Sequence, residues 1–139
     1  MQLLKVAAVA ASAMVLAVPA GSATAQVRAE RVERVQFARG ANSATVRGQI
    51  RGYGMVDYLV NARAGQRMTV RFATRGRFTY FLVRAPGSEE NLLDGTSSGG
   101  TAELTLPASG AYRIRVFQMR NAARRGERSN YTLTVRVDG

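Results

Sequence analysis

Apolar and polar residues alternate with a period of two in short runs along most of this chain. The run "RMTVRF" shows the pattern well, because Met68, Val70 and Phe72 alternate with Arg67, Thr69 and Arg71. Such alternation is typical of half-buried β-strands. It predicts about eight strands, with a further short one around 91–93. The predicted strands cover residues 32–38, 44–50, 55–62, 67–72, 79–85, 102–107, 112–119 and 131–137.

The segments between these runs are rich in residues that form turns. "RGAN", "RGYG", "RAGQR", "TRGR" and "PASGA" all contain glycine, which adopts the backbone conformations that tight turns need. Many short strands joined by regularly spaced turns predict an all-β domain, either an antiparallel β-sandwich or a barrel. The least regular stretch, Ser88–Gly100, is expected to be a long surface connection.

The first residues have a different character from the rest. Lys5 precedes an apolar run from Val6 to Val18, and Ala23-Thr24-Ala25 supplies the small residues of a cleavage site. This arrangement predicts a signal peptide over residues 1–25, because the run is too short to span a membrane. We therefore expect a single domain over residues 26–139 that is periplasmic or secreted and has no membrane attachment after the signal is removed.

Composition and charge narrow the chemistry. The formal net charge is +11, and after Lys5 every basic residue is an arginine. Arginine offers a planar fork of donors that suits carboxylates and phosphates. The chain has neither cysteine nor histidine, so it lacks the commonest general base and the commonest metal ligand. We predict a protein that is not an enzyme and that uses no cofactor and no metal.

Carboxylates give little support for catalysis either. Glu89 and Glu90 are neighbours in a predicted loop, and Asp57, Asp94 and Glu103 are far apart in the sequence. No serine has a histidine or lysine partner that would activate it as a nucleophile. Binding is therefore the class of function that the residues favour.

Two exposed connections are the candidates for binding. "MRNAARRGE" joins the last two predicted strands, and its "RNAAR" segment permits a helical turn with Arg120 and Arg124 on one face. Tyr53 lies between two glycines in "RGYG", where few neighbours can cover its ring. Arg125 is expected to be solvated charge. Arginines at alternate strand positions, such as Arg71 and Arg115, are expected on a solvated sheet face.

One further turn, "LPASGAYRIRV", leads into a predicted strand. Ser109 and Gly110 supply its turn residues, and Tyr112 is in phase with Ile114 and Val116. The phase places Tyr112 in the core or in a corner of the fold rather than at a binding surface.

Together these segments resemble a known family. "VQFARG…GQIRGY", "ARAGQRMTV" and "LPASGAYRIRVFQMRNAARRGERSNYTLTV" are similar to the periplasmic inhibitors of goose-type (g-type) lysozyme, over residues 35–137. The resemblance implies an eight-stranded antiparallel β-sandwich and a protein partner, g-type lysozyme, with an acidic cleft. By motif, it implies that Tyr53, Arg120 and Arg124 bind this partner. It places the family's "SG" turn at Ser109 and Gly110, which are expected partner-binding residues as well.

A second interpretation stays open at this stage. A generic secreted β-sandwich that binds a polyanion or an acidic glycan would also carry many arginines, with its affinity spread over all of them. Nucleic acid is the less expected partner. A structural or adhesion module, in which the arginines only confer solubility, is a third possibility.

Overall fold

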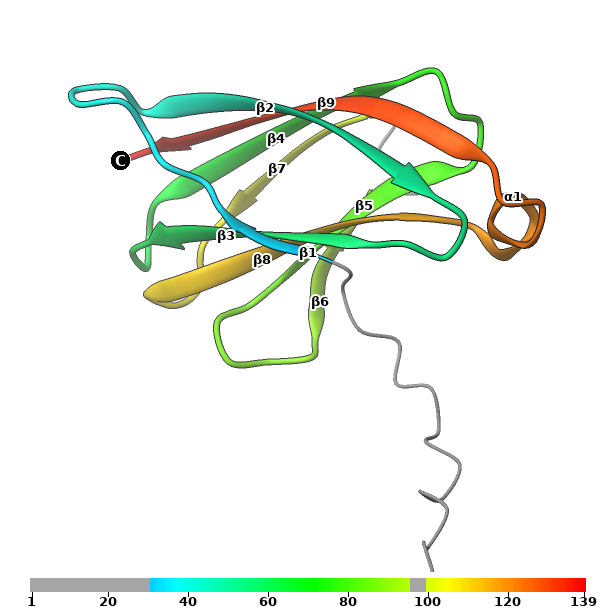
Figure 1. The fold of residues 1–139 in the computed structure, drawn as a ribbon. Helices are drawn as coiled ribbons and strands as arrows, with labels where there is room; N and C mark the ends of the chain where they lie inside the picture. The colour runs from blue at the N-terminus through cyan, green and yellow to red at the C-terminus, as the bar shows by residue number, and fades with distance from the viewer. Residues whose placement is uncertain (1–30, 96–99) are drawn as a thin grey trace, which may run out of the picture.

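The computed structural model describes residues 31–95 and 100–139, which form two packed β-sheets. Figure 1 shows the sheets as the two layers of a sandwich, with one short helix at one end. The predicted signal peptide and part of the predicted Ser88–Gly100 connection lie outside the described residues. Among the described residues, no helix is long and apolar enough to cross a membrane.

One sheet has five strands in the order β1-β3-β8-β5-β6. Its strands are β1 (Arg31–Arg34), β3 (Val56–Ala62), β5 (Thr79–Arg84), β6 (Asn91–Asp94) and β8 (Gly110–Gln118). The other sheet has four strands in the order β2-β9-β4-β7. Its strands are β2 (Ser43–Arg51), β4 (Arg67–Thr74), β7 (Thr101–Thr105) and β9 (Arg128–Asp138). The helix α1 (Arg120–Arg124) connects β8 to β9.

The predicted all-β sandwich is confirmed, with two differences in detail. The first predicted strand, 32–38, is shorter than expected, because β1 ends at Arg34 and the chain then crosses to the other sheet. Val35 is nevertheless buried, and its N–H donates to the Leu59 carbonyl. The second difference is that β1 pairs with β3 in parallel, whereas every other pair of strands is antiparallel.

The core fills the space between the sheets with the apolar residues of the alternating runs. Tyr58 and Tyr131 meet there from opposite sheets, and their buried hydroxyls are 2.6 Å apart. Burial, followed by this hydrogen bond, raises the pKa of Tyr131 above the ordinary tyrosine value. Tyr112 is fully buried and its hydroxyl donates to the Ala108 carbonyl, which confirms the expected corner packing.

The outer face of the five-stranded sheet corrects the expectation that all strand arginines are simply solvated. The Arg115 side chain is only 12% exposed and donates two hydrogen bonds, of 2.7 and 3.0 Å, to the buried carboxylate of Asp57. Arg113 approaches the same carboxylate at 3.5 Å. The hydrogen bond with Asp57 raises the pKa of Arg115. Arg67, Arg71 and Arg136, on the other sheet, are exposed as expected.

Candidate functional site

The candidate site lies at the end of the sandwich where β8 leads into α1. After β8, Met119 has an extended backbone, and a single helical turn follows from Arg120 to Arg124. The turn forms as the alanine-containing sequence predicts, and it is held by its own short hydrogen bonds, such as that from the Ala123 N–H to the Met119 carbonyl at 2.9 Å. The chain then reverses at Gly126 into β9.

Burial gives this helical turn two different faces. Ala122 and Ala123 are 0% and 3% exposed, so the alanines pack against the end of the sandwich. Arg120 and Arg124, four positions apart and therefore on one face, are both exposed. Within the described part of the chain, neither arginine forms an ion pair. Both guanidinium forks are thus available to an acidic partner.

Arg125 differs from these two arginines although it is also exposed. Its side chain pairs with Glu127 at 3.1 Å, two positions along the same connection. This pairing partly compensates its charge, which suits the expectation that Arg125 stays outside the binding pair.

Tyr53 lies at the same end, in the turn between β2 and β3. The Gly54 N–H donates to the Arg51 carbonyl at 2.9 Å, which closes a tight turn around Gly52 and Tyr53. The Tyr53 side chain is 64% exposed, the most exposed large hydrophobic residue of the described chain. Its ring therefore projects to solvent, as the flanking glycines predict.

Strand pairing explains why two connections so far apart in sequence meet. β3 runs antiparallel to β8, and Val56 near the start of β3 pairs with Val116 near the end of β8. The connection that precedes β3 and the one that follows β8 must therefore leave the sheet at the same end, as Figure 1 shows for the β2–β3 turn and α1. No local sequence pattern reveals this placement.

Backbone hydrogen bonds join the two connections directly. The Gly52 N–H donates to the Glu127 carbonyl at 2.9 Å. Gln118 donates its side-chain amide to the carbonyls of Glu127 at 2.8 Å and Gly52 at 3.3 Å. Gln118 was not among the predicted site residues, because a glutamine at the end of a strand gives no signal in the sequence. It fixes the Tyr53 turn against the arginine helix.

The backbone conformation of Gly52 favours glycine in this arrangement, because its φ is +57°. A Cβ there would make an ordinary contact, 3.5 Å from the Ala123 carbonyl oxygen, so the turn packs closely against α1. A residue with a side chain would strain the backbone of the turn. We refer to the Tyr53 turn and α1, held together by Gly52, Gln118 and Glu127, as the Tyr-Arg edge.

Ser109 and Gly110 lie at the opposite end of β8 from the Tyr-Arg edge. Nine residues of strand separate the two ends, which is roughly 27 Å. The Ser109 hydroxyl accepts a hydrogen bond from the Ala64 N–H at 2.9 Å, so it joins the β7–β8 and β3–β4 turns. A Cβ at Gly110 would lie 2.8 Å from Pro86, which explains the glycine. The structure thus does not bring these two residues together with Tyr53, Arg120 and Arg124.

Chemically, the Tyr-Arg edge presents groups that suit binding. It has two unpaired guanidinium groups and one projecting phenol ring, which are residue types that often dominate protein interfaces. In the described residues, no group of acidic residues is placed to hold a metal ion. The fold and the edge together define a β-sandwich that presents these side chains on the connections at one end.

Comparison with known proteins gives this class a family. No protein-family model matches the chain. The inhibitor of g-type lysozyme from Escherichia coli (strain K12) is 32% identical over 106 residues, which cover 74% of this chain and 78% of that protein. The chain therefore belongs to the family of g-type lysozyme inhibitors, as the resemblance of its motifs predicted.

Solved structures agree with this assignment. The crystal structure of Aeromonas hydrophila PliG, a periplasmic lysozyme inhibitor of g-type lysozyme, is similar with a TM-score of 0.73 and 39% identity, covering 78% of this chain and 96% of that one. Salmonella Typhimurium PliG gives a TM-score of 0.63 and 30% identity, covering 78% and 98%. Because these relatives are periplasmic inhibitors, they confirm the predicted export and the prediction of a protein that is not an enzyme.

Proposed function

We propose that this protein inhibits g-type lysozyme by inserting the Tyr-Arg edge into the active-site cleft of the enzyme. One observation carries the proposal: Gln118 and Gly52 hold the exposed Tyr53 turn against the helix that carries the unpaired Arg120 and Arg124. The relatives, which are named as inhibitors of this lysozyme class, supply the identity of the partner.

The residue types suit such a cleft. A glycosidase of this kind cleaves its substrate with carboxyl groups in a groove shaped for sugars. Arg120 and Arg124 would pair with carboxylates there, since a guanidinium fork binds a carboxylate through two parallel hydrogen bonds. The Tyr53 ring, with an apolar body and a polar tip, would occupy the place of a sugar. Inhibition would be competitive and would need no cofactor.

The Tyr-Arg edge is already ordered in the free protein, which should raise its affinity for the lysozyme. Ala122 and Ala123 anchor the helical turn in the core, and Gln118 joins it to the Tyr53 turn, so little backbone freedom remains to be lost on binding. Loops that are ordered before they bind lose less entropy in the complex. The Gln118 contacts are for this reason part of the proposal.

The test measures how strongly each purified variant inhibits a goose-type lysozyme. The readout is the rate at which the enzyme lyses a cell-wall suspension. Arg120→Ala and Arg124→Ala should each weaken inhibition by about 2 kcal/mol or more, which is roughly thirtyfold. Arg125→Ala is the matched control, because it removes the same charge from the same connection, and it should change inhibition less than threefold. If both Arg120→Ala and Arg124→Ala inhibit as well as the parent, the proposed site is wrong.

Two further arms test the remaining residues. Tyr53→Ala should weaken inhibition, whereas Ser109→Ala tests whether the other end of the sandwich also contacts the enzyme, as the family motif implies. Chicken-type and invertebrate-type lysozymes serve as specificity controls. Inhibition of all three classes to the same degree would contradict a g-type inhibitor.

A further inference from the structure

A second basic surface lies on the outer face of the four-stranded sheet. Strand register arranges the outward side chains of this sheet in rows. Arg51 is opposite Arg128, and Arg47 is opposite Thr132, which is in turn opposite Ala73. Successive rows are about 7 Å apart, since every second residue of a strand faces the same way.

Four arginines occupy the half of this face nearest α1, and no carboxylate lies among them. They are Arg47, Arg51, Arg75 and Arg128. None of the four forms an ion pair with any residue that the structure describes. The carboxylates of the face, Glu103 and Asp138, lie in the rows toward the other end, where Asp138 pairs with Arg136 at 2.9 Å.

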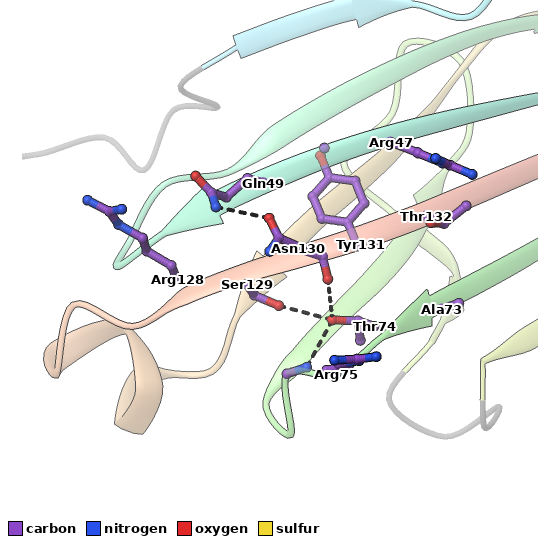
Figure 2. Close-up of a pocket in the computed structure, with 12 residues that line it drawn as sticks. Arg47, Gln49, Ala73, Thr74, Arg75, Arg128, Ser129, Asn130, Tyr131 and Thr132 are labelled. Atoms are coloured by element: carbon purple, nitrogen blue, oxygen red, sulfur yellow. Dashed lines mark hydrogen bonds between the residues drawn. The ribbon is translucent and has the colours of Figure 1, made fainter.

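Part of this half is hollowed into an open cleft of about 1000 Å³. Arg47, Arg75 and Arg128 contribute to its lining, and Figure 2 shows them spread around a floor that contains Gln49 and Asn130. The Gln49 amide donates to the Asn130 side-chain oxygen at 2.9 Å. We refer to this hollow as the arginine cleft.

The floor of the arginine cleft presents both donors and acceptors. With one hydrogen bond between them, Gln49 keeps its side-chain oxygen as an acceptor and Asn130 keeps its amide as a donor. The Thr132 hydroxyl, in the neighbouring row, adds a group that does both. A ligand that matched this floor would carry hydroxyl or amide groups as well as negative charge.

We propose that the arginine cleft binds a glycan strand that carries carboxylates. Sugar hydroxyls and amides would exchange hydrogen bonds with Gln49, Asn130 and Thr132, and the three guanidinium forks would pair with the carboxylates. A phosphate polymer offers acceptors alone and would make no hydrogen bond with the exposed Gln49 side-chain oxygen. Single-stranded nucleic acid binds its bases by stacking on aromatic rings, and the described residues that face outward from this sheet include none.

The arginine cleft is a different surface from the Tyr-Arg edge. It is built from strands β2, β4 and β9 and the start of the β4–β5 turn, whereas the edge is built from the β2–β3 and β8–β9 connections. Arg51, which is opposite Arg128 where β2 ends and β9 begins, lies between the two. The protein would then hold a glycan on one surface and meet its protein partner on the adjacent one.

The experiment measures binding of the purified protein to oligogalacturonate, a glycan with a carboxylate on each sugar, by calorimetry in 150 mM salt. Dextran is the neutral control and polyphosphate is the control for charge alone. The triple variant Arg47→Gln, Arg75→Gln, Arg128→Gln should bind oligogalacturonate at least tenfold more weakly. A matched triple at the far end, Arg63→Gln, Arg67→Gln, Arg136→Gln, removes the same charge and should weaken binding less than threefold.

The floor supplies a test that does not change the charge. Gln49→Ala with Asn130→Ala should weaken oligogalacturonate binding about fivefold and leave polyphosphate binding unchanged. Equal losses in the two arginine triples would show diffuse attraction and overturn the proposal. So would tighter binding of polyphosphate through the same three arginines, or an unaltered glycan affinity in the floor variant.

Measuring lysozyme inhibition by the same variants distinguishes this proposal from the function proposed above. The cleft triple should inhibit g-type lysozyme within threefold of the parent, and Arg120→Ala with Arg124→Ala should bind oligogalacturonate as the parent does. If the cleft triple lost inhibition in proportion to glycan binding, the cleft would belong to the lysozyme interface and the separate site would be refuted. Thermal unfolding of each variant checks that these exposed substitutions leave the fold intact.

Discussion

The two sheets turn arginines outward with the same alternating pattern, yet their outer faces hold these charges in different ways. On the five-stranded sheet, Arg115 and Arg113 share the carboxylate of Asp57, which is only 3% exposed, and Arg84 pairs with Glu89 at 2.6 Å. On the four-stranded sheet, the four arginines near α1 have no carboxylate partner among the described residues. On the first face these arginines have carboxylate partners, whereas the second face is open to an anionic ligand.

This difference separates two kinds of information in the sequence. Alternation decides which side chains face outward, and it does so equally well for both sheets. Register decides which charges become neighbours, and Asp57 lies directly opposite Arg115 because β3 and β8 pair in that register. A strand arginine can therefore be structural or available for binding, and only the partner strand tells which.

The largest expected effect tests the ion pairs on the outer face of the five-stranded sheet. Arg115→Ala would leave the buried Asp57 carboxylate without its main partner, and should lower the free energy of unfolding by about 2 to 3 kcal/mol. Arg71→Ala, at an exposed strand position on the other sheet, should lower it by less than about 0.5 kcal/mol. Urea unfolding of both variants measures the difference. Equal losses would mean that the two faces do not differ in the way described.

The core between the two sheets should give the next largest effect, which appears in alkaline solution. Burial and the hydrogen bond with Tyr58 raise the pKa of Tyr131, so the folded protein keeps this proton when the unfolded chain has lost it, above about pH 10. Unfolding then releases a proton, and the free energy of unfolding should fall by up to about 1.4 kcal/mol per pH unit. Below about pH 10, the contribution of the protonated Tyr131 to the free energy of unfolding is fully present.

Two variants test whether this loss of unfolding free energy at alkaline pH comes from the core. Tyr131→Phe should remove the extra slope, and Tyr80→Phe, which changes a half-buried tyrosine of β5, should retain it. Because arginine keeps its charge over this range, the outer faces should not contribute. A slope that persisted in Tyr131→Phe would place the titrating group elsewhere.

The smallest expected effect concerns the unpaired charges of the four-stranded sheet. Thr132 lies beside Arg47 in the register of β2 and β9. Thr132→Glu would introduce a carboxylate among the arginines and should raise the free energy of unfolding by about 0.5 kcal/mol at low salt, relative to Thr132→Gln. The difference should nearly vanish in 1 M salt, since exposed pairs are screened there. A Glu variant no more stable than the Gln variant would show that the arginines already have their charge compensated.

Much of the fold could be predicted because its strands alternate clearly. Met68, Val70 and Phe72 are all buried, as their spacing indicates. The parallel pairing of β1 could not be predicted, because four residues of strand carry no pattern that fixes the direction of their partner. The ion pair of Arg115 could not be predicted either, because its partner Asp57 is 58 positions away in the sequence.

The candidate site was predictable in its parts and not in its assembly. The helical turn at Arg120–Arg124 follows from local helix propensity, and the exposure of Tyr53 follows from its glycine neighbours. The contact between them depends on the pairing of β3 with β8, which no local sequence pattern indicates. Only the resemblance to a known family grouped Tyr53 with Arg120 and Arg124 in advance. Whether Tyr53, Arg120 and Arg124 bind the enzyme stays a prediction that the inhibition series will decide.

The pairing of β2 with β9 has a consequence for how the protein reaches its compartment. β2 lies early in the described chain and its nine residues pair with β9, the last strand, so that Thr45 and Thr134 are hydrogen-bonded across 89 positions. The four-stranded sheet cannot close until the C-terminal strand has been synthesised, and contacts this distant form slowly. We therefore expect this sheet to stay open until β9 is available, which suits passage through a narrow export channel as an unfolded chain.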